Sequence, residues 1–404
     1  MPELAEIHRI VHFIRQHLVG KTLSKVSTQH DDIIYGKVGT SAAEFQKATE
    51  GKKVTGAGQQ GKYFWITMSS PPHAVMHFGM AGWLKIRDAD TYYYRTDKPE
   101  DKQWPPKYWK FLLETDGDPK TEAAFVDFRR LARIRLVDCP ADEIRKYTPL
   151  KENGPDPVVD KEVVTEEWLG GKLKSKKVPT KALLLDQAVI SGIGNWMGDE
   201  ILYHAKIHPE QYSHTLTDDQ IKELHSSLHY VCSTSTEVLA DSDQFPEHWL
   251  FKHRWGKGKK NKPSVLPNGE KITFLTVGGR TSAVVPSVQK KTGPVAGDVK
   301  EEDESSDERE AKRKRTATKK EAPSTKKADS KKQSKQPARV EEDESSDEHE
   351  TKRKRTVIKK EAPSTKNADS TKQSKQTAMV EENESVKKDK ARTQTTRRST
   401  RLRK

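Results

Sequence analysis

The sequence predicts an α+β protein, in which a β-rich N-terminal part precedes a helical part, a β-hairpin and a basic tail. Short alternating segments punctuated by Gly and Pro fill the first 140 residues, which is typical of a β-sandwich or barrel. Apolar residues recur at helical spacing from about residue 150 and nearly vanish beyond residue 290. Because 32% of the 404 residues are hydrophobic and 33% are charged, we expect part of the chain to be disordered.

A helix is predicted over residues 4–18. Its apolar residues share one face, namely Leu4, Ile7, Ile10, Val11, Ile14 and Leu18. Glu3 and Glu6 lie at the positive end of this helix, where carboxylates are favourable. Since these acids precede any apolar stretch, the segment does not resemble a signal peptide.

Four strand-like segments follow this helix. They cover residues 61–68, 74–86, 108–115 and 122–138. Each is short and alternating, so we expect them to pair into the sandwich or barrel.

The second half of the ordered region is expected to be helical. Helices are predicted over 179–190, over 195–206 and from about 218, where Thr217 and Gln220 form a capping box. The third helix carries an apolar stripe of Ile221, Leu224, Leu228 and Val231. Residues 270–286 predict a hairpin with Gly278-Gly279-Arg280 at its turn.

The tail consists of charged low-complexity repeats. Residues 341–380 repeat residues 301–340 with 8 of 40 positions changed, and almost none of these residues is apolar. Such a repeat has nothing to bury, so we expect disorder rather than a solenoid. Residues 301–404 hold 31 Lys+Arg and 22 Asp+Glu, so most of the net charge of +14 lies there. The KRKR clusters at 312–315 and 352–355 indicate nuclear import, although a solvated charge run is the simpler alternative.

Composition excludes several classes of protein. Cys139 and Cys232 are the two cysteines of the sequence, too few for a disulfide framework or a four-cysteine zinc site. No apolar run is long enough to span a membrane. The basic excess indicates a polyanionic partner, nucleic acid before others.

The opening MPELAE has a chemical interpretation. Removal of Met1 leaves Pro2 with a free secondary amine, whose pKa near ~7.7–8 provides a neutral fraction at cellular pH. Attack of such an amine on an aldehyde-level carbon produces a cationic iminium, which acidifies the adjacent C–H and favours elimination. Glu3 and Glu6 are placed to move protons. The alternative is an ordinary helix start, which also favours Pro and acids.

Six blocks in this order resemble the formamidopyrimidine-DNA glycosylase family, specifically its plant and fungal branch. They are MPELAEI at 1–7, GKYFWI at 61–66, HFGMAGWL at 77–84, DFRRLARIRL at 127–136, LLLDQAVISGIGNWMGDEILYHAKIHP at 183–209 and GGRT at 278–281. The resemblance spans roughly residues 2–290, and the 183–209 block is similar to the helix–two-turn–helix DNA-binding element of the family.

The resemblance implies catalytic roles. Pro2 would be the Schiff-base nucleophile, Glu3 the acid/base acting on the sugar, and Glu6 a support for the Pro2–Glu3 turn. Lys62 matches a hairpin lysine that contacts phosphate and donates a proton in strand cleavage; a snorkelling surface lysine is the alternative. Arg280 matches an arginine that grips the phosphates flanking the lesion.

The resemblance also implies DNA-binding residues. Met80, Arg129 and Leu131 fall where the family has a wedge that fills the gap left by an extruded base. The family usually has Phe where Leu131 stands, and core packing is the alternative for Met80. Asn195, at a helix start whose N–H groups favour a phosphate, would add a donor, with Lys181 assisting; an N-cap role is the alternative for Asn195.

Bacterial relatives hold the hairpin with four zinc-binding cysteines, and none lies near residues 250–290. We therefore expect a zincless finger, held by strand pairing and by apolar residues such as Ile272, Phe274, Val284 and Val285. The resemblance implies a reaction that needs no metal and no cofactor.

The resulting prediction is a bifunctional DNA glycosylase and AP lyase of base excision repair. It would remove oxidised purines through a Schiff base on Pro2, followed by β- and δ-elimination. Two alternatives stay open: an endonuclease VIII-type glycosylase for oxidised pyrimidines, and a non-catalytic DNA- or chromatin-binding protein. Leu4 disfavours the former, which usually has Gly there, and the intact set of Pro2, Glu3, Lys62 and Arg280 disfavours the latter.

The expected architecture has four parts. An N-terminal two-layer β-sandwich with flanking helices covers 1–140, a helix–two-turn–helix domain 141–250, a zincless hairpin 251–290 and a disordered basic tail 291–404. The partner would be damaged double-stranded DNA, without membrane association. We expect a monomer in the nucleus, with protein partners reached through the tail.

Overall fold

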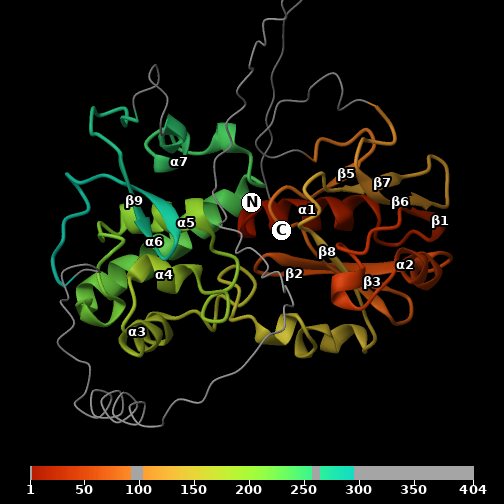
Figure 1. The fold of residues 1–404 in the computed structure, drawn as a ribbon, viewed down its shortest axis with the longest axis horizontal. Helices are drawn as coiled ribbons and strands as arrows, with labels where there is room; N and C mark the ends of the chain where they lie inside the picture. Colours follow the sequence, from red (N-terminus) through yellow and green to blue (C-terminus); the bar gives the residue numbers. More distant parts are fainter. Residues whose placement is uncertain (1, 92–102, 257–263, 295–404) are drawn as a thin grey trace, which may run out of the picture. The chain divides into compact units, whose positions relative to one another are not determined.

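The computed structural model describes residues 2–91, 103–256 and 264–294 (Figure 1). The predictions of a disordered tail and of nuclear-import clusters lie outside these residues. The helices are α1 (Leu4–His17), α2 (Ala42–Thr49), α3 (Glu166–Lys174), α4 (Thr180–Leu185), α5 (Asn195–His204), α6 (Asp218–Glu237) and α7 (Leu250–His253). Short 3₁₀ turns are η1 (Gly36–Val38), η3 (Ala141–Lys146), η4 (Leu150–Glu152), η5 (Ser213–Thr215), η6 (Ser242–Gln244) and η7 (Arg254–Gly256).

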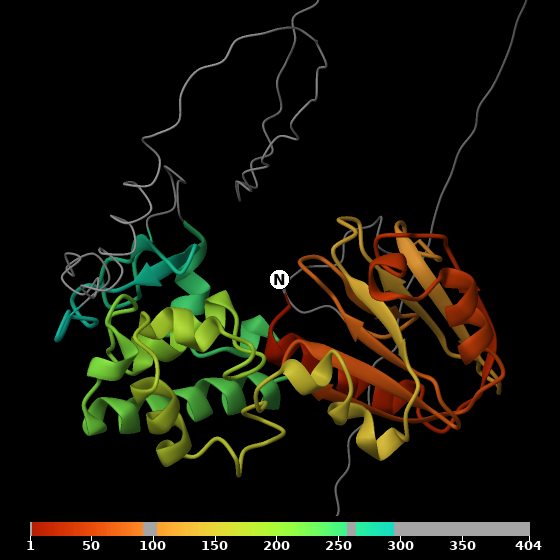
Figure 2. The same cartoon turned by 60° about the horizontal axis from the view of Figure 1, so that its bottom comes forward.

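Two antiparallel four-stranded sheets form the N-terminal part, and Figure 2 shows their strands as two layers. The first has the order β1 (Leu23–Thr28), β6 (Trp109–Thr115), β7 (Glu122–Val126) and β5 (Trp83–Ile86). The second has the order β2 (Val54–Gln60), β3 (Tyr63–Met68), β4 (His73–His77) and β8 (Arg133–Val137). Buried side chains of both sheets, such as Phe111 and Phe64, belong to one core. The predicted two-layer sandwich is confirmed.

Two predicted strands are each divided between the sheets. The segment 74–86 becomes β4 and β5, because a turn at 79–82 redirects the chain and Gly79 adopts a φ of 62°. The segment 122–138 becomes β7 and β8, because the loop 127–132 intervenes. Apolar alternation continues across both breaks, so the single-strand predictions were wrong about continuity.

Strands β1 and β2 and helix α2 were not predicted. The sequence of β2 contains Gly56 and Gly58, which disfavour a strand on propensity. Pairing with β3 from Val54↔Met68 to Gln60↔Tyr63 outweighs that preference. At Gly58 an added Cβ would lie 2.3 Å from the Trp65 ring, so this glycine admits the ring against the backbone.

Helix α1 connects two hydrophobic cores. Leu4 and Ala5 pack into the core of the helical part, whereas Ile7, Ile10 and Ile14 pack into the sandwich core. All of these residues are fully buried, which confirms the predicted apolar face. Residues on the first turn of α1 are therefore fixed by both parts of the protein.

The three predicted helices of the helical part are present as α4, α5 and α6, but α4 and α5 end earlier than predicted, and α3 was not predicted. The capping box of Thr217 and Gln220 is present at the start of α6. Helix α4 ends at Leu185 instead of 190, because the Asp186 carboxylate accepts from Ala188 N at 3.1 Å and turns the chain. None of the described helices is long and apolar enough to cross a membrane.

The C-terminal hairpin consists of β9 (Thr273–Val277) and β10 (Arg280–Val284). Gly278 and Gly279 form its two-residue turn with φ values of 57° and 72°, the left-handed pair that a type I′ turn needs. Arg280 is thus the first residue of β10 and lies at the tip as predicted. Ile272 and Val285 are buried in a small core with Leu250, and Phe274 packs against it.

Candidate DNA-repair active site

The Glu3 carboxylate is bound by the N-terminus of α5. Glu3 Oε2 accepts from Gly194 N at 2.9 Å and from Met197 N at 3.1 Å, and Oε1 accepts from Trp196 N at 3.0 Å. The side chain is 2% exposed. A negative charge is favourable at this helix end, so α5 fixes the orientation of the residue that follows Pro2.

Glycines make this arrangement possible. A Cβ on Gly194 would lie 2.2 Å from Glu3 Cδ, and one on Gly192 would lie 2.7 Å from Leu4 Cδ1 and 3.0 Å from Gly61 Cα. Gly192 and Gly61 also adopt positive φ values of 99° and 60°. We call residues 2–4, 61–62 and 191–194 the N-terminal junction. These three segments can approach one another so closely because glycines without a Cβ lie at the points of contact.

Glu6 lies beneath this junction. Its Oε2 accepts from Glu3 N at 2.7 Å, as expected for a residue that supports the Pro2–Glu3 turn. Complete burial raises the pKa of Glu6 to about 8, and the neighbouring charge of Glu3 adds to the rise. Glu6 therefore holds a proton at neutral pH.

Lys62 lies in the turn between β2 and β3 and is 8% exposed. The buried Asp156 fastens this turn, because its carboxylate accepts from Gly61 N at 2.8 Å. Burial lowers the pKa of the Lys62 ammonium, the charge of Glu3 opposes this, and the charge of Arg280 adds to the lowering. Glu3 and Arg280, which are both far from Lys62 in sequence, thus act on the Lys62 ammonium electrostatically.

The predicted phosphate site at the start of α5 needs correction. Three N–H groups there, those of Gly194, Trp196 and Met197, bind the Glu3 carboxylate rather than facing outward. Gly194 is the N-cap and Asn195 is the first helical residue. The Asn195 amide donates to Thr281 O at 2.8 Å, so it ties α5 to the hairpin.

Lys181 cannot assist a phosphate contact, because it is completely buried. Its ammonium pairs with Asp199 Oδ1 and donates to Asn195 O at 2.6 Å. Asp199 Oδ2 accepts from Ala283 N of β10 at 2.9 Å and pairs with Arg254 at 2.6 Å. Lys181, Asp199 and Arg254 form a buried ion-pair cluster that joins α4, α5 and the hairpin.

The residues of the predicted wedge lie on two adjacent loops. A Cβ on Gly79 would lie 2.4 Å from the Leu131 carbonyl, so the turn carrying Met80 packs against the loop carrying Leu131. Met80 is half-buried and belongs to none of the described core clusters, which disfavours core packing as its role. Arg129 is exposed, and Leu131 is 39% exposed.

Two aspartates fix the loop 127–132, which we call the wedge loop, by hydrogen bonds. Asp127 accepts from Ala132 N at 2.7 Å and from Arg129 N at 3.0 Å. Asp31 accepts two hydrogen bonds at 3.0 Å from Arg130, whose φ is 56°. Burial alone would raise the pKa of Asp31, but hydrogen bonds, that of Arg130 first, outweigh it and bring the pKa to about 2.

Comparison with protein families identifies the chain. Residues 1–134 match the formamidopyrimidine-DNA glycosylase N-terminal domain, and residues 154–246 match the H2TH domain of the same glycosylase. Formamidopyrimidine-DNA glycosylase of Arabidopsis thaliana is 39% identical over 295 residues, which cover 72% of each chain. The chain belongs to the formamidopyrimidine-DNA glycosylase family. It is a DNA glycosylase of base excision repair with AP lyase activity.

Other members of the family agree with this identification. The glycosylase of Desulforamulus reducens is 31% identical over 303 residues, covering 72% of this chain and 99% of that relative. The Lactococcus lactis glycosylase, solved non-covalently bound to DNA with an AP site, aligns with a TM-score of 0.57 over 72% of this chain and 100% of that one. At 22% identity this alignment shows the shared fold.

Residues 264–294 contain no Cys and no His, and Cys139 and Cys232 are buried as free thiols elsewhere. Hydrogen bonds with Asp199 and Asn195 anchor β10 to the helical part.

Sequence reasoning missed several residues of this site. His77 lines a hollow of about 320 Å³ with Lys62, and its Nδ1 accepts from Gly79 N at 2.9 Å. Burial, with the charge of Lys62 next, lowers the pKa of His77 to about 4, so the ring is neutral. The HFGMAGWL block contains His77 and the DFRRLARIRL block contains Asp127, whereas no block contains the buried Asp156.

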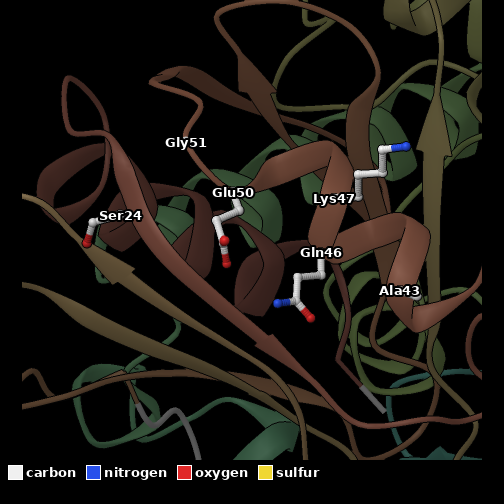
Figure 3. Close-up of a pocket in the computed structure, with 6 residues that line it drawn as sticks. All are labelled: Ser24, Ala43, Gln46, Lys47, Glu50 and Gly51. Atoms are coloured by element: carbon white, nitrogen blue, oxygen red, sulfur yellow. The ribbon is translucent and has the colours of Figure 1, made fainter.

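A larger hollow of about 550 Å³ lies between β1 and α2 (Figure 3). Glu50 and Gln46 line it, with Ser24 across from them. Glu50 already accepts from Val26 N at 2.8 Å, and Gln46 from the Thr28 hydroxyl at 3.3 Å. None of the site residues described above lines it, and we assign it no role.

Proposed function

We propose that Pro2, freed by removal of Met1, is the nucleophile of this glycosylase. The observation that carries the proposal is the binding of Glu3 by three N–H groups of α5, which fixes the backbone next to Pro2. Pro2 itself is buried in the junction. Preorganisation of this kind is what a nucleophile needs to meet a fixed carbon atom.

The reaction begins when the damaged nucleotide is extruded from the stack, which costs less for a damaged pair. The Pro2 nitrogen then bonds to C1′ and loses its proton while the glycosidic bond breaks, and the base leaves with its electron pair, protonated on departure. The C1′–O4′ bond of the sugar breaks next, O4′ takes up a proton, and the nitrogen lone pair forms the iminium with C1′. The iminium acidifies the C2′–H, so β-elimination expels the 3′ phosphate. A δ-elimination then expels the 5′ phosphate and leaves a one-nucleotide gap.

The remaining site residues have supporting roles. Glu3 is the acid/base acting on the sugar, and Glu6 holds the Pro2–Glu3 turn. Lys62 contacts a phosphate and donates a proton in strand cleavage, and Arg280 binds the phosphates that flank the lesion. Met80, Arg129 and Leu131 fill the gap in the duplex. The exposure of Arg129 and Leu131, and the packing of their loop against the turn that carries Met80, support this role.

The partner is damaged double-stranded DNA, and the substrates are oxidised purines. Formamidopyrimidines come first, followed by 8-oxoguanine and hydantoins. The rates of base excision from a panel of lesion-containing duplexes, measured with the full chain and with residues 1–300, rank these substrates. Preference for oxidised pyrimidines would place the protein with the endonuclease VIII-type enzymes instead.

Borohydride trapping tests the nucleophile directly. Reduction on AP-site DNA, followed by peptide mapping, is expected to locate the adduct on the N-terminal peptide at Pro2. Pro2→Gly should bind lesion DNA nearly as well as the wild type but trap far less adduct. An adduct on Lys62 or another lysine, or full lyase activity in Pro2→Gly, would overturn the assignment.

We further propose that the protein belongs to the zincless plant and fungal branch of the family. The absence of Cys and His from residues 264–294 supports this. Elemental analysis is expected to find no stoichiometric zinc. One zinc per chain would refute it.

We also propose a nuclear monomer whose tail reaches protein partners. The KRKR clusters at 312–315 and 352–355 support nuclear import. Replacing both clusters by alanine in a fluorescent fusion should redistribute it to the cytoplasm, and unchanged nuclear accumulation would contradict the proposal. Sedimentation of the full chain checks the monomer.

A further inference from the structure

Two large aromatic side chains beside the wedge loop face solvent. Phe128 is 52% exposed and Tyr108 is 50% exposed, and their ring centroids are 6.4 Å apart. Leaving two such rings half in water forgoes the favourable burial that aromatic side chains usually gain. Adjacent exposed aromatics with no place in the core indicate a binding surface.

The backbone on either side of these rings adopts conformations that are energetically unfavourable. Tyr108 has a φ of 65°, a conformation that is unfavourable for residues with a Cβ. Its carbonyl accepts from Asp127 N at 3.2 Å, so the start of β6 is tied to the wedge loop. On the other side of Phe128, Arg130 also has a positive φ and is fixed by Asp31. Strain of this kind persists where surrounding contacts enforce it, often at functional positions.

Two cationic side chains lie close to the rings. The Lys107 ammonium lies 5.0 Å from the centre of the Tyr108 ring, and the exposed Arg129 follows Phe128 directly. Phe128 shares its loop with Leu131, which is proposed to enter the duplex. Aromatic faces next to cations are the combination that binds unpaired nucleotides, because bases stack on the rings and phosphates pair with the cations.

We propose that Phe128 and Tyr108 form a stacking site for an unpaired nucleobase of the strand opposite the lesion, with Lys107 near a phosphate of that strand. This rests on the proposed function, in which extrusion of the lesion and excision both leave the opposite base without a partner. The opposite strand is favoured because the pair is continuous with the wedge loop. Stacking tolerates every base, so the site retains the enzyme on intermediate and product rather than selecting the lesion.

Paired duplexes test the site. One carries a tetrahydrofuran abasic analogue opposite adenine, and the other carries the analogue opposite a second analogue. The wild type is expected to bind the first about tenfold more tightly. Phe128→Ala should bind both equally, whereas Phe128→Tyr should keep the preference. With 2-aminopurine opposite the analogue, the wild type should quench its fluorescence and Phe128→Ala should not.

Controls separate this proposal from the proposed function. Tyr147→Ala removes another exposed aromatic, 39% exposed, and should keep the preference. Borohydride trapping reports the proposed function independently of stacking: if wild type traps adduct but binds both duplexes equally, the stacking site alone is refuted. The stacking site is also refuted if Phe128→Ala weakens binding to both duplexes by the same factor. It is refuted as well if Phe128→Ala abolishes self-association of the protein but keeps the preference for the duplex with adenine opposite the analogue.

Discussion

The N-terminal junction and the wedge loop are both proposed to meet DNA, yet they are built in opposite ways. At the junction, Glu3 is buried, glycine backbones touch, and α5 supplies the hydrogen bonds. In the wedge loop, Phe128 and Leu131 face solvent, Asp127 binds backbone N–H groups of the loop, and Asp31 binds the Arg130 side chain. Bond-making requires fixed atoms, whereas filling a gap in DNA requires accessible apolar surface. Changes at the junction should therefore impair structure and chemistry together, and changes at the wedge loop should affect binding alone.

The largest expected effect lies behind the junction, in the ion-pair cluster. Asp199→Ala leaves the cations of Lys181 and Arg254 buried without their carboxylate, which costs about 3–5 kcal/mol. Urea unfolding should show this loss, and amide exchange at Ala283 should accelerate. Asp218→Asn, at an exposed ion pair with Lys174, is the matched control and should leave the midpoint unchanged. If the urea midpoint of unfolding of Asp199→Ala equalled that of the wild type, contacts other than the ion-pair cluster would anchor the hairpin.

Gly194→Ala tests the chemistry of the junction. A Cβ there would lie 2.2 Å from Glu3 Cδ and should displace the carboxylate from α5. We expect a loss of about 100-fold or more in kcat for base excision, since oriented electrostatic groups contribute on that scale. Single-turnover kinetics measures it. Gly171→Ala, where no atom lies within 4 Å of the added Cβ, is the control, and activity of Gly194→Ala within threefold of that control would contradict the role of the Glu3 arrangement.

The raised pKa of Glu6 predicts that the stability of the fold depends on pH. The pKa of Glu6 is about 8 in the folded protein against an ordinary value of 4.5, so between these values the folded state retains a proton that the unfolded state has lost. The contribution of protonated Glu6 to the free energy of unfolding is complete below about pH 4.5. It declines as the pH rises towards 8, with a slope of up to about 1.4 kcal/mol per pH unit. Urea unfolding at pH 5.5, 6.5 and 7.5 should show a shallower decline for Glu6→Gln. Parallel curves for both proteins would mean that Glu6 ionises normally.

The smallest effect is expected at the wedge loop. Leu131→Ala should leave the unfolding free energy within about 0.5 kcal/mol, because this residue is partly exposed. Binding to an abasic duplex should weaken roughly fivefold, equivalent to about 1 kcal/mol. Fluorescence anisotropy measures the affinity. A loss of stability larger than the loss of affinity would erase the distinction between the two regions.

Much of the fold was predictable from sequence. The apolar face of α1, the capping box of α6 and the turn at Gly278-Gly279 depend on residues within a few positions of one another. Such local rules hold before the chain is packed. The order of the six motif blocks likewise indicated the family, which the matches at 1–134 and 154–246 show.

Other features depended on contacts between distant segments. Glu3 and Gly194 are 191 positions apart, so no local pattern could show that the α5 N-terminus binds a carboxylate instead of a phosphate. Lys181 has the composition of a surface residue, and only Asp199, 18 positions away, explains why it is buried. Phe128 resembles an ordinary core aromatic until the loop turns it outward.

The sequence by itself determined the α+β class, the family and the residue types available for an iminium reaction. The tertiary structure decided which of those residues meet, which helix end binds which anion, and where the chain leaves one sheet for the other. The division has one physical reason: helix periodicity, caps and tight turns are set by neighbours along the chain. The burial and pairing of a charge, in contrast, are set by segments that only folding brings together.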